Sequence, residues 1–208
     1  MTKEPLIEII AVTYDHGFKL KCFIDSIRSQ TYKNWALHII HDGEGEMFIS
    51  LKEDLTKNGY LDDNNIVLSS TKERHNRWGH PSRDYGLINR ISNASLITIT
   101  NCDNYYVPVW LEEVNEVYNT DIEFIYWDCV HNHTNRNFDR ADGYGLMTAN
   151  AETNFLDIGS FAVNAEIATK VGFKWTRANA DRDFSRACRQ LIEQNKIHKI
   201  KKILFTHN

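Results

Sequence analysis

The sequence has no run of about 18 apolar residues, so we expect no membrane-spanning helix. Its first residues, Met-Thr-Lys-Glu-Pro, lack the apolar core of a signal peptide, and we therefore expect a cytoplasmic protein. The four cysteines form no CxxC pair, which argues against a zinc site and against a disulfide framework. The formal net charge of −4 provides no general attraction to nucleic acid.

What the sequence does contain is a regular alternation of strand and helix patterns over its first half. Short apolar runs predict buried strands, as in a parallel sheet that is covered on both faces. Between them, apolar residues at helical spacing predict amphipathic helices. The strands are expected at 6–12, 37–40, 66–68 and 96–99, and the helices around 20–27, 48–55, 87–91 and 111–117.

The pattern changes after Asp121. A strand is expected at 124–127, a polar loop at 131–154, a strand at 155–163, a helix at 184–192 and a last strand at 200–205. The composition, 42% hydrophobic and 25% charged over 208 residues, fits one sizeable domain. We therefore predict a single α/β domain with a mostly parallel wound sheet and helices on both faces. Its halves would be residues 1–110, which bind a nucleotide, and 111–208, which bind an acceptor.

The segment 96–111 is the centre of this prediction. Asn101, Asp103 and Asn104 would lie just past the carboxyl end of a central strand, where open α/β sheets bind ligands. We expect the Asp103 carboxylate to hold a metal, although an aspartate there could also be a turn former or a helix cap. Pro108 fits the first turn of the next helix, and Ser82 or Asp84 could cap the helix before the strand.

A series of short motifs carries a family resemblance. They include Val-Thr-Tyr-Asp at 12–15, Ile-Ile-His-Asp-Gly at 39–43 and Cys-Asp-Asn-Tyr-Tyr-Val-Pro at 102–108. In this order they resemble family 2 inverting glycosyltransferases of the Rossmann-like GT-A fold. Spore-coat-polysaccharide-type enzymes share Lys72-Glu-Arg74 and the Asp103–Asn104 pair. The remaining matching segments are 26–35, 83–89, 157–163, 170–173 and 180–184.

The resemblance implies that Asp103 holds Mn²⁺ or Mg²⁺ against the diphosphate of a nucleotide-sugar donor. This sequence departs from the family pattern because Asn101, Cys102 and Asn104 flank Asp103. A single carboxylate implies weak metal affinity without the nucleotide, whose phosphates would complete the coordination shell. In several GT-A enzymes a histidine near the C-terminus is a further ligand. His207 is the candidate here, and the alternative is a disordered terminal residue.

The nucleobase site is expected at the ends of the first two strands. There Asp42 could accept the imide N–H of uracil, which favours a UDP-sugar, and dTDP would fit the same contacts. Arg74 matches the family's loop arginine and could contact the base or a phosphate, with Arg77 and Arg83 as alternatives. The full set of expected nucleotide contacts is Thr13, Tyr14, Asp42, Arg74, Arg83, Asn101 and Asp103.

Transfer with inversion requires a general base for the acceptor hydroxyl. The family places it at the start of the helix after the acceptor loop, where Asp181 fits and Asp183 is the alternative. Acidic residues also stabilise helix starts without any catalytic role. Stacking or polar contacts to the sugar and the acceptor are expected from Trp127, Asp128, Asp157, Gly159, Ser160 and Trp175, although Trp127 could equally be a core residue.

These observations predict a divalent-metal-dependent inverting glycosyltransferase with a hydroxyl acceptor such as a glycan. A nucleotidyltransferase is disfavoured because 13–18 holds one glycine and no glycine- and lysine-rich phosphate loop. Two alternatives remain open. One is a non-catalytic protein that binds sugar nucleotides, which the reduced acidic motif favours. The other is a glycosyltransferase that acts on modified bases in DNA, and the only feature that favours it is the basic segment 196–202.

Overall fold

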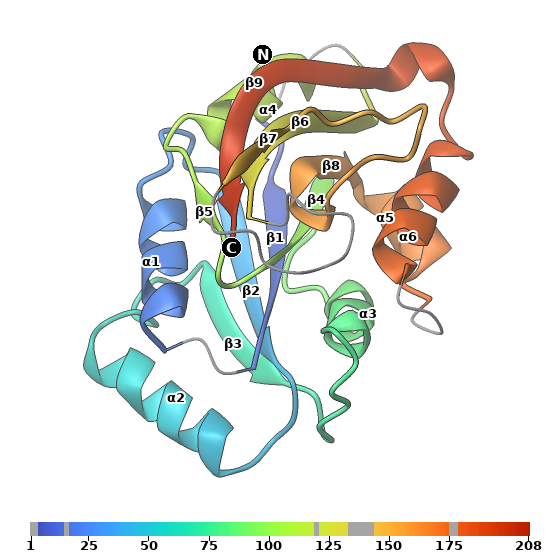
Figure 1. The fold of residues 1–208 in the computed structure, drawn as a ribbon. Coiled ribbons are helices and arrows are strands. Elements are labelled where there is room, and N and C mark those ends of the chain that lie inside the picture. The colour runs from blue at the N-terminus through green and yellow to red at the C-terminus, as the bar shows by residue number, and fades with distance from the viewer. Residues whose placement is uncertain (1–3, 15–16, 119–120, 133–143, 175–178) are drawn as a thin grey trace.

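One mixed sheet with helices on both faces organises the protein (Figure 1). The computed structural model describes residues 4–14, 17–118, 121–132, 144–174 and 179–208. The strand order is β3-β2-β1-β4-β8-β6-β9-β5, and β7 pairs with β6 outside this path. The strands of the first half are β1 (Ile7–Thr13), β2 (Trp35–His41), β3 (Ile66–Ser70) and β4 (Leu96–Asn101), and all are parallel.

The side chains of β1 and β2 are buried along their whole length, which explains their near-continuous apolar sequence. On one face of the sheet the core includes side chains of helices α1 (Gly17–Arg28), α2 (Glu46–Lys57) and α4 (Trp110–Tyr118). On the other face it includes side chains of α3 (His80–Ile88), α5 (Ala165–Val171) and α6 (Ala180–Arg189). The prediction of an α/β wound sheet covered on both faces is therefore confirmed.

The second half extends the same sheet with strands of both directions. Strand β8 (Phe161–Asn164) is antiparallel to both β4 and β6 (Phe124–His131), and β6 is parallel to β9 (Ile197–His207). The end of β9 pairs with the short β5 (Tyr105–Tyr106), which follows β4. This pairing returns the C-terminal residues to the edge where β4 ends. The remaining elements are β7 (Gly145–Met147) and the 3-10 turns η1 (Ile158–Ser160) and η2 (Gln194–Lys196).

Six strands (β1, β2, β3, β4, β6 and β9) run in one direction, while β5, β7 and β8 run in the opposite one. Some predicted boundaries were wrong. Helix α3 begins at His80 after the N-cap residue Gly79, so Ser82 and Asp84 lie inside this helix rather than at its N-cap. Only the end of the segment 155–163 is a strand, because η1 precedes β8. Pro108 lies before α4 rather than in its first turn.

No helix in the described part of the chain combines the length and apolarity needed to cross a bilayer.

Gly86 allows α3 to approach the sheet closely. A Cβ atom there would lie 2.5 Å from Cγ2 of Ile10 and 2.6 Å from Cδ1 of Ile40. We expect Gly86→Ala to lower the free energy of unfolding, because overpacking costs about 1–3 kcal/mol and helix propensity returns at most about 1 kcal/mol. Urea unfolding measures this. The control Ser50→Ala, at an exposed position of α2, should change stability by less than about 0.5 kcal/mol. A Gly86→Ala protein as stable as the wild type would contradict the close packing.

Candidate active site

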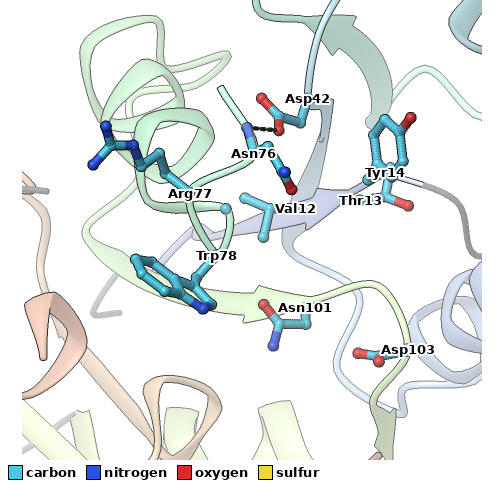
Figure 2. Close-up of a pocket in the computed structure, with 10 residues that line it drawn as sticks. Val12, Thr13, Tyr14, Asp42, Asn76, Arg77, Trp78, Asn101 and Asp103 are labelled. Carbon is cyan, nitrogen blue, oxygen red and sulfur yellow. Dashed lines mark hydrogen bonds between the residues drawn. The ribbon is translucent and has the colours of Figure 1, made fainter. Parts of the chain in front are cut away.

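A cleft of about 290 Å³ lies where strands β1, β2 and β4 end (Figure 2). Its walls come from the turns that follow β1 and β2, from the loop that precedes α3 and from the β4–β5 turn. This is the sheet edge at which the sequence predicted a ligand. The lining residues are Val12, Thr13, Tyr14, Asp42, Asn76, Arg77, Trp78, Gly79, Asn101 and Asp103.

Asp42 holds the loop that forms one wall of the cleft. Its Oδ1 accepts the backbone N–H of His75 at 3.0 Å. Its Oδ2 accepts the backbone N–H of Asn76 at 2.9 Å, the bond that is dashed in Figure 2. The following chain is left-handed at Asn76, Trp78 and Gly79, with φ of 49°, 52° and 75°. Such backbone is uncommon for residues other than glycine and is often found at ligand sites. The carboxylate therefore fixes an unusual loop as well as facing the cleft.

Arg74 lies at the rim of the cleft, over Tyr14. Its guanidinium carbon is 3.6 Å from the centre of the Tyr14 ring, which is a close cation–π contact. The Tyr14 hydroxyl donates to Sδ of Met47 at 3.3 Å. One face of the Tyr14 ring is thus covered by a cation. Arg74 itself is not among the residues that line the cavity.

The buried guanidinium of Arg83 joins the cleft to the start of α6. Its Nη2 donates to Oδ1 of Asn101 at 2.7 Å, and its Nη1 donates to the carbonyl of Trp78 at 2.9 Å. Nη1 also lies 3.2 Å from Oδ1 of Asp181, a residue 98 positions away. His80 completes this group, with its Nδ1 2.7 Å from Nη1 and 3.4 Å from the same carboxylate oxygen. Arg83 therefore links the loop before α3, the end of β4 and the start of α6, and it is not among the residues that line the cleft.

The two candidate bases have different surroundings. The side chain of Asp181 is about one-third exposed and contacts Arg83 through Oδ1. Asp183 pairs with Arg186 at 2.9 Å and lines a different cavity, whose walls come from the end of α5 and from α6. The network that reaches the cleft thus includes Asp181 and not Asp183.

Asp103 lies in the β4–β5 turn and lines the cleft. Its Oδ1 is buried and has no hydrogen-bond partner among the described residues. A buried carboxylate oxygen without a partner is costly, and a divalent cation would satisfy it. The residue therefore fits the predicted metal-ligand role on its own geometry.

The alternative of a disordered tail at His207 is wrong, because this residue ends β9 and its side chain is buried. It lies against His131, with ring centroids 4.1 Å apart, and near Asp157. Burial lowers the pKa of His207, and the negative charges of Asp157, Asp103 and Asp181 oppose this shift. Burial raises the pKa of Asp157, but its interaction with His131 and the charge of His207 bring it below the usual value.

Several of the predicted sugar contacts are core or structural residues. Trp127 is fully buried against Trp110, so the prediction that it stacks on a sugar was wrong. Gly159 and Ser160 are also buried, and a Cβ atom at Gly159 would lie 2.7 Å from the Tyr106 hydroxyl. The lack of a side chain at Gly159 therefore lets core residues pack closely against its backbone, rather than a ligand.

The two predicted carboxylates of the second half are engaged within the protein. Asp128 pairs with Lys199 at 2.8 Å and accepts the N–H of Ala149. Asp157 accepts the N–H of Gly159 and thereby caps η1. Trp175 lies outside the described residues.

Sequence reasoning missed the contribution of the loop before α3. Arg77 had been only an alternative, and Asn76 and Trp78 had been given no role, yet all three line the cleft. The Trp78 side chain is 69% exposed there, and Figure 2 shows it across the cleft from Tyr14. A tryptophan within a polar, cation-rich loop was the available signal, since exposed tryptophans are uncommon away from binding surfaces.

Comparisons with known protein-family models and with curated proteins give no match. Solved structures do match. The structure of S. aureus TarS 1–349 in complex with UDP superposes with a TM-score of 0.74 at 11% identity, covering 97% of this chain and 60% of that one. The Pyrobaculum calidifontis mannosyltransferase PcManGT, in complex with GDP-Man and Mn²⁺, superposes with a TM-score of 0.62 at 14% identity, covering 97% of this chain and 56% of that one. This chain has the GT-A fold. It spans little more than half the length of these proteins, and 36% of a longer TarS chain.

The role of Asp42 in the loop gives a prediction that does not depend on function. We expect Asp42→Ala to accelerate amide hydrogen exchange at residues 75–79, because two backbone donors lose their acceptor. Stability should fall by about 1–3 kcal/mol. Hydrogen exchange followed by mass spectrometry measures the first effect, with Glu44→Ala at the exposed neighbouring position as control. Unchanged exchange in this loop would show that Asp42 does not hold it.

Proposed function

We propose that this protein transfers a sugar, with inversion, from a nucleoside-diphosphate sugar to an acceptor hydroxyl with the help of a divalent cation. The observation that carries the proposal is the unpartnered, buried Oδ1 of Asp103 in a cleft at the ends of β1, β2 and β4. Support comes from the shared GT-A fold, since one protein of that fold was solved with UDP and another with GDP-Man and Mn²⁺. Because the sequence identities are only 11% and 14%, this support comes from the shared fold and not from sequence similarity.

Asp103 is the proposed protein ligand of Mn²⁺ or Mg²⁺, and His207, whose pKa responds to the charge of Asp103, is the proposed further ligand. Hard cations bind carboxylate oxygens. Mg²⁺ typically binds one or two carboxylates and completes its coordination shell with phosphate oxygens and water. A bound cation would neutralise charge that develops on the departing diphosphate. Because Asp103 has no acidic neighbour in the β4–β5 turn, cation and nucleotide should bind together more tightly than either does alone.

The proposed nucleotide contacts are Thr13, Tyr14 and Asp42. The hydroxyl of Thr13 is buried without a partner among the described residues. Each oxygen of Asp42 already accepts one backbone N–H, and a carboxylate oxygen has a second lone pair with which it could accept the imide N–H of uracil. Arg77 in the cleft and Arg74 at its rim would provide positive charge for the phosphates. UDP is therefore the favoured carrier, with dTDP as the closest substitute.

Asp181 is the proposed general base. Arg83 and His80 both contact Oδ1, so they would fix the orientation of the carboxylate. Oδ2 would then accept the proton of the acceptor hydroxyl as that oxygen attacks the anomeric carbon. Arg83 donates to Asn101 as well, and would thereby keep the base at a fixed distance from the donor cleft.

A glycan or other small hydroxyl acceptor is favoured over DNA. The basic segment that had suggested nucleic acid is largely neutralised by ion pairs within the protein. Lys196 pairs with Glu123, Lys199 with Asp128 and Lys202 with Glu113, at 3.4, 2.8 and 2.5 Å. Little positive charge from this segment remains to attract phosphates.

We expect Asp103→Asn to abolish Mn²⁺-dependent binding of UDP, because the amide oxygen carries no charge for the cation. Isothermal titration calorimetry with UDP, with and without Mn²⁺, measures this. The control Glu46→Gln, at an exposed position of the neighbouring α2, should bind like the wild type. Identical titrations for the wild type and Asp103→Asn would refute the metal role of Asp103.

We expect Asp181→Asn to bind UDP normally but to release UDP from a sugar donor about 10²–10⁴-fold more slowly. A panel of UDP-, dTDP- and GDP-sugars, assayed for nucleotide release with candidate acceptors, provides the measurement. Asp183→Asn is the matched control on the same helical turn and should retain activity. Transfer by Asp181→Asn at the wild-type rate would exclude it as the base. A wild-type protein that binds UDP and transfers no sugar from any donor would instead be a non-catalytic binder.

A further inference from the structure

Trp78 presents a large aromatic surface to the cleft. It lines the cavity and is 69% exposed, whereas Trp35, Trp110 and Trp127 are buried. An indole that stays in water forgoes the hydrophobic stabilisation that its burial would provide. Trp78 therefore contributes little to the core, and a binding role explains its exposure.

The protein holds Trp78 in an uncommon backbone conformation. Its φ of 52° lies in the left-handed region, which a bulky side chain rarely adopts. Before it in the chain, Asp42 accepts the backbone N–H groups of His75 and Asn76. The carbonyl of Trp78 itself accepts a hydrogen bond from Nη1 of Arg83 at 2.9 Å. Backbone that is strained and fixed in this way is typical of ligand sites, where it presents a side chain in a set direction.

The indole lies at the end of the cleft that is joined to the proposed base. Its ring centroid is 6.0 Å from that of His80, whose Nδ1 is 3.4 Å from Oδ1 of Asp181. The guanidinium of Arg83 that binds the carbonyl of Trp78 also donates to Asn101 and contacts Asp181. Trp78 is therefore close to the place where an acceptor hydroxyl would lose its proton.

The nucleotide end of the cleft has an aromatic ring of its own, at Tyr14. Figure 2 shows this ring across the cleft from Trp78, and the guanidinium of Arg74 covers one of its faces at 3.6 Å. A nucleotide that is held by Tyr14, Thr13 and Asp42 would leave the indole of Trp78 to a different part of the substrates.

A pyranose ring matches an exposed indole beside a general base. The C–H groups on one face of the sugar form an apolar surface, which packs against the electron-rich face of an aromatic ring. Its equatorial hydroxyls lie around the edge of the ring, where polar side chains can reach them. An acyclic polyol or an alkyl alcohol has no rigid face of this kind, so stacking would select for a ring.

We propose that Trp78 is the platform on which a pyranose ring of the acceptor stacks, so that one hydroxyl of that ring faces Asp181. This inference rests on the proposed transferase function and names its acceptor class as a pyranoside, in preference to an acyclic polyol or a lipid alcohol. The acceptor fits this place better than the donor sugar does. The reason is that the indole lies beside the base that acts on the acceptor and is open to solvent.

Trp78→Ala and Trp78→Phe test the platform in the intact protein. Transfer from the sugar donor that the wild type uses is measured with methyl pyranosides of glucose, galactose, mannose and N-acetylglucosamine, and with glycerol as the acyclic acceptor. We expect Trp78→Ala to raise the KM for the best pyranoside about 10-fold and to change kcat little, because an aromatic stack and its apolar contact are lost. Trp78→Phe should recover most of this affinity. UDP binding and the slow release of UDP to water should stay at wild-type levels in both variants.

Phe18→Ala is the matched control. It removes another highly exposed aromatic side chain, which is not among the residues that line the cleft, and it should leave all of these values unchanged.

Saturation-transfer NMR of the same pyranosides without nucleotide separates this inference from the transferase proposal. We expect signals from the ring protons with the wild type and their loss with Trp78→Ala. If the protein binds pyranosides in this way but neither binds nor turns over a nucleotide sugar, the transferase proposal fails while Trp78 remains a pyranose platform. Transfer to glycerol and to no pyranoside would overturn the platform and leave the transferase proposal intact.

Two further results would overturn the inference. One is an equal KM and equal NMR signals for the wild type and Trp78→Ala, which would show that the acceptor does not contact the indole. The other is weaker binding of UDP or of the sugar donor by Trp78→Ala, which would assign the indole to the nucleobase or to the donor sugar instead.

Discussion

The contact on which the site depends is the buried guanidinium of Arg83 between Asn101 and Asp181. A buried cation must be paired and hydrogen-bonded, because its desolvation is otherwise prohibitive. The structure meets this requirement with an amide at the end of β4, a carboxylate in the first turn of α6 and the carbonyl of Trp78. These partners come from three separate segments. The charge therefore ties the end of β4, the loop before α3 and the start of α6 together.

A second constraint is the return of β9 to the edge where β4 ends. The parallel pairing of β6 with β9 and the antiparallel pairing of β9 with β5 bring the last residues beside Asp103. A stack of Tyr106 between Trp110 and Phe205 fills the space beneath this corner. The chain thus closes the second half of the sheet on the first, and hydrogen bonds from Asn208 join its end to the β4–β5 turn.

Much of the fold could be predicted because its signals are local. The apolar runs of β1, β2 and β4 and the helical spacing in α1 reflect burial along one element at a time. The predictions that were wrong depended on contacts between elements. Trp127 could stack on a sugar or fill a core, and only its packing against Trp110 decided between the two. The same holds for Gly159, because its lack of a side chain makes room for the Tyr106 hydroxyl rather than for a ligand.

The sequence by itself determined the α/β class, the edge of the sheet that forms a cleft, and the position of Asp103, Thr13 and Asp42 at that edge. Each of these follows from where a buried strand ends, which is a property of neighbouring residues. Only the tertiary structure decided that Asp181 rather than Asp183 reaches Arg83, and that His131, Asp157 and His207 converge. Those groupings join residues tens of positions apart. Their proximity arises from strand register and helix packing, and no local pattern in the sequence encodes it.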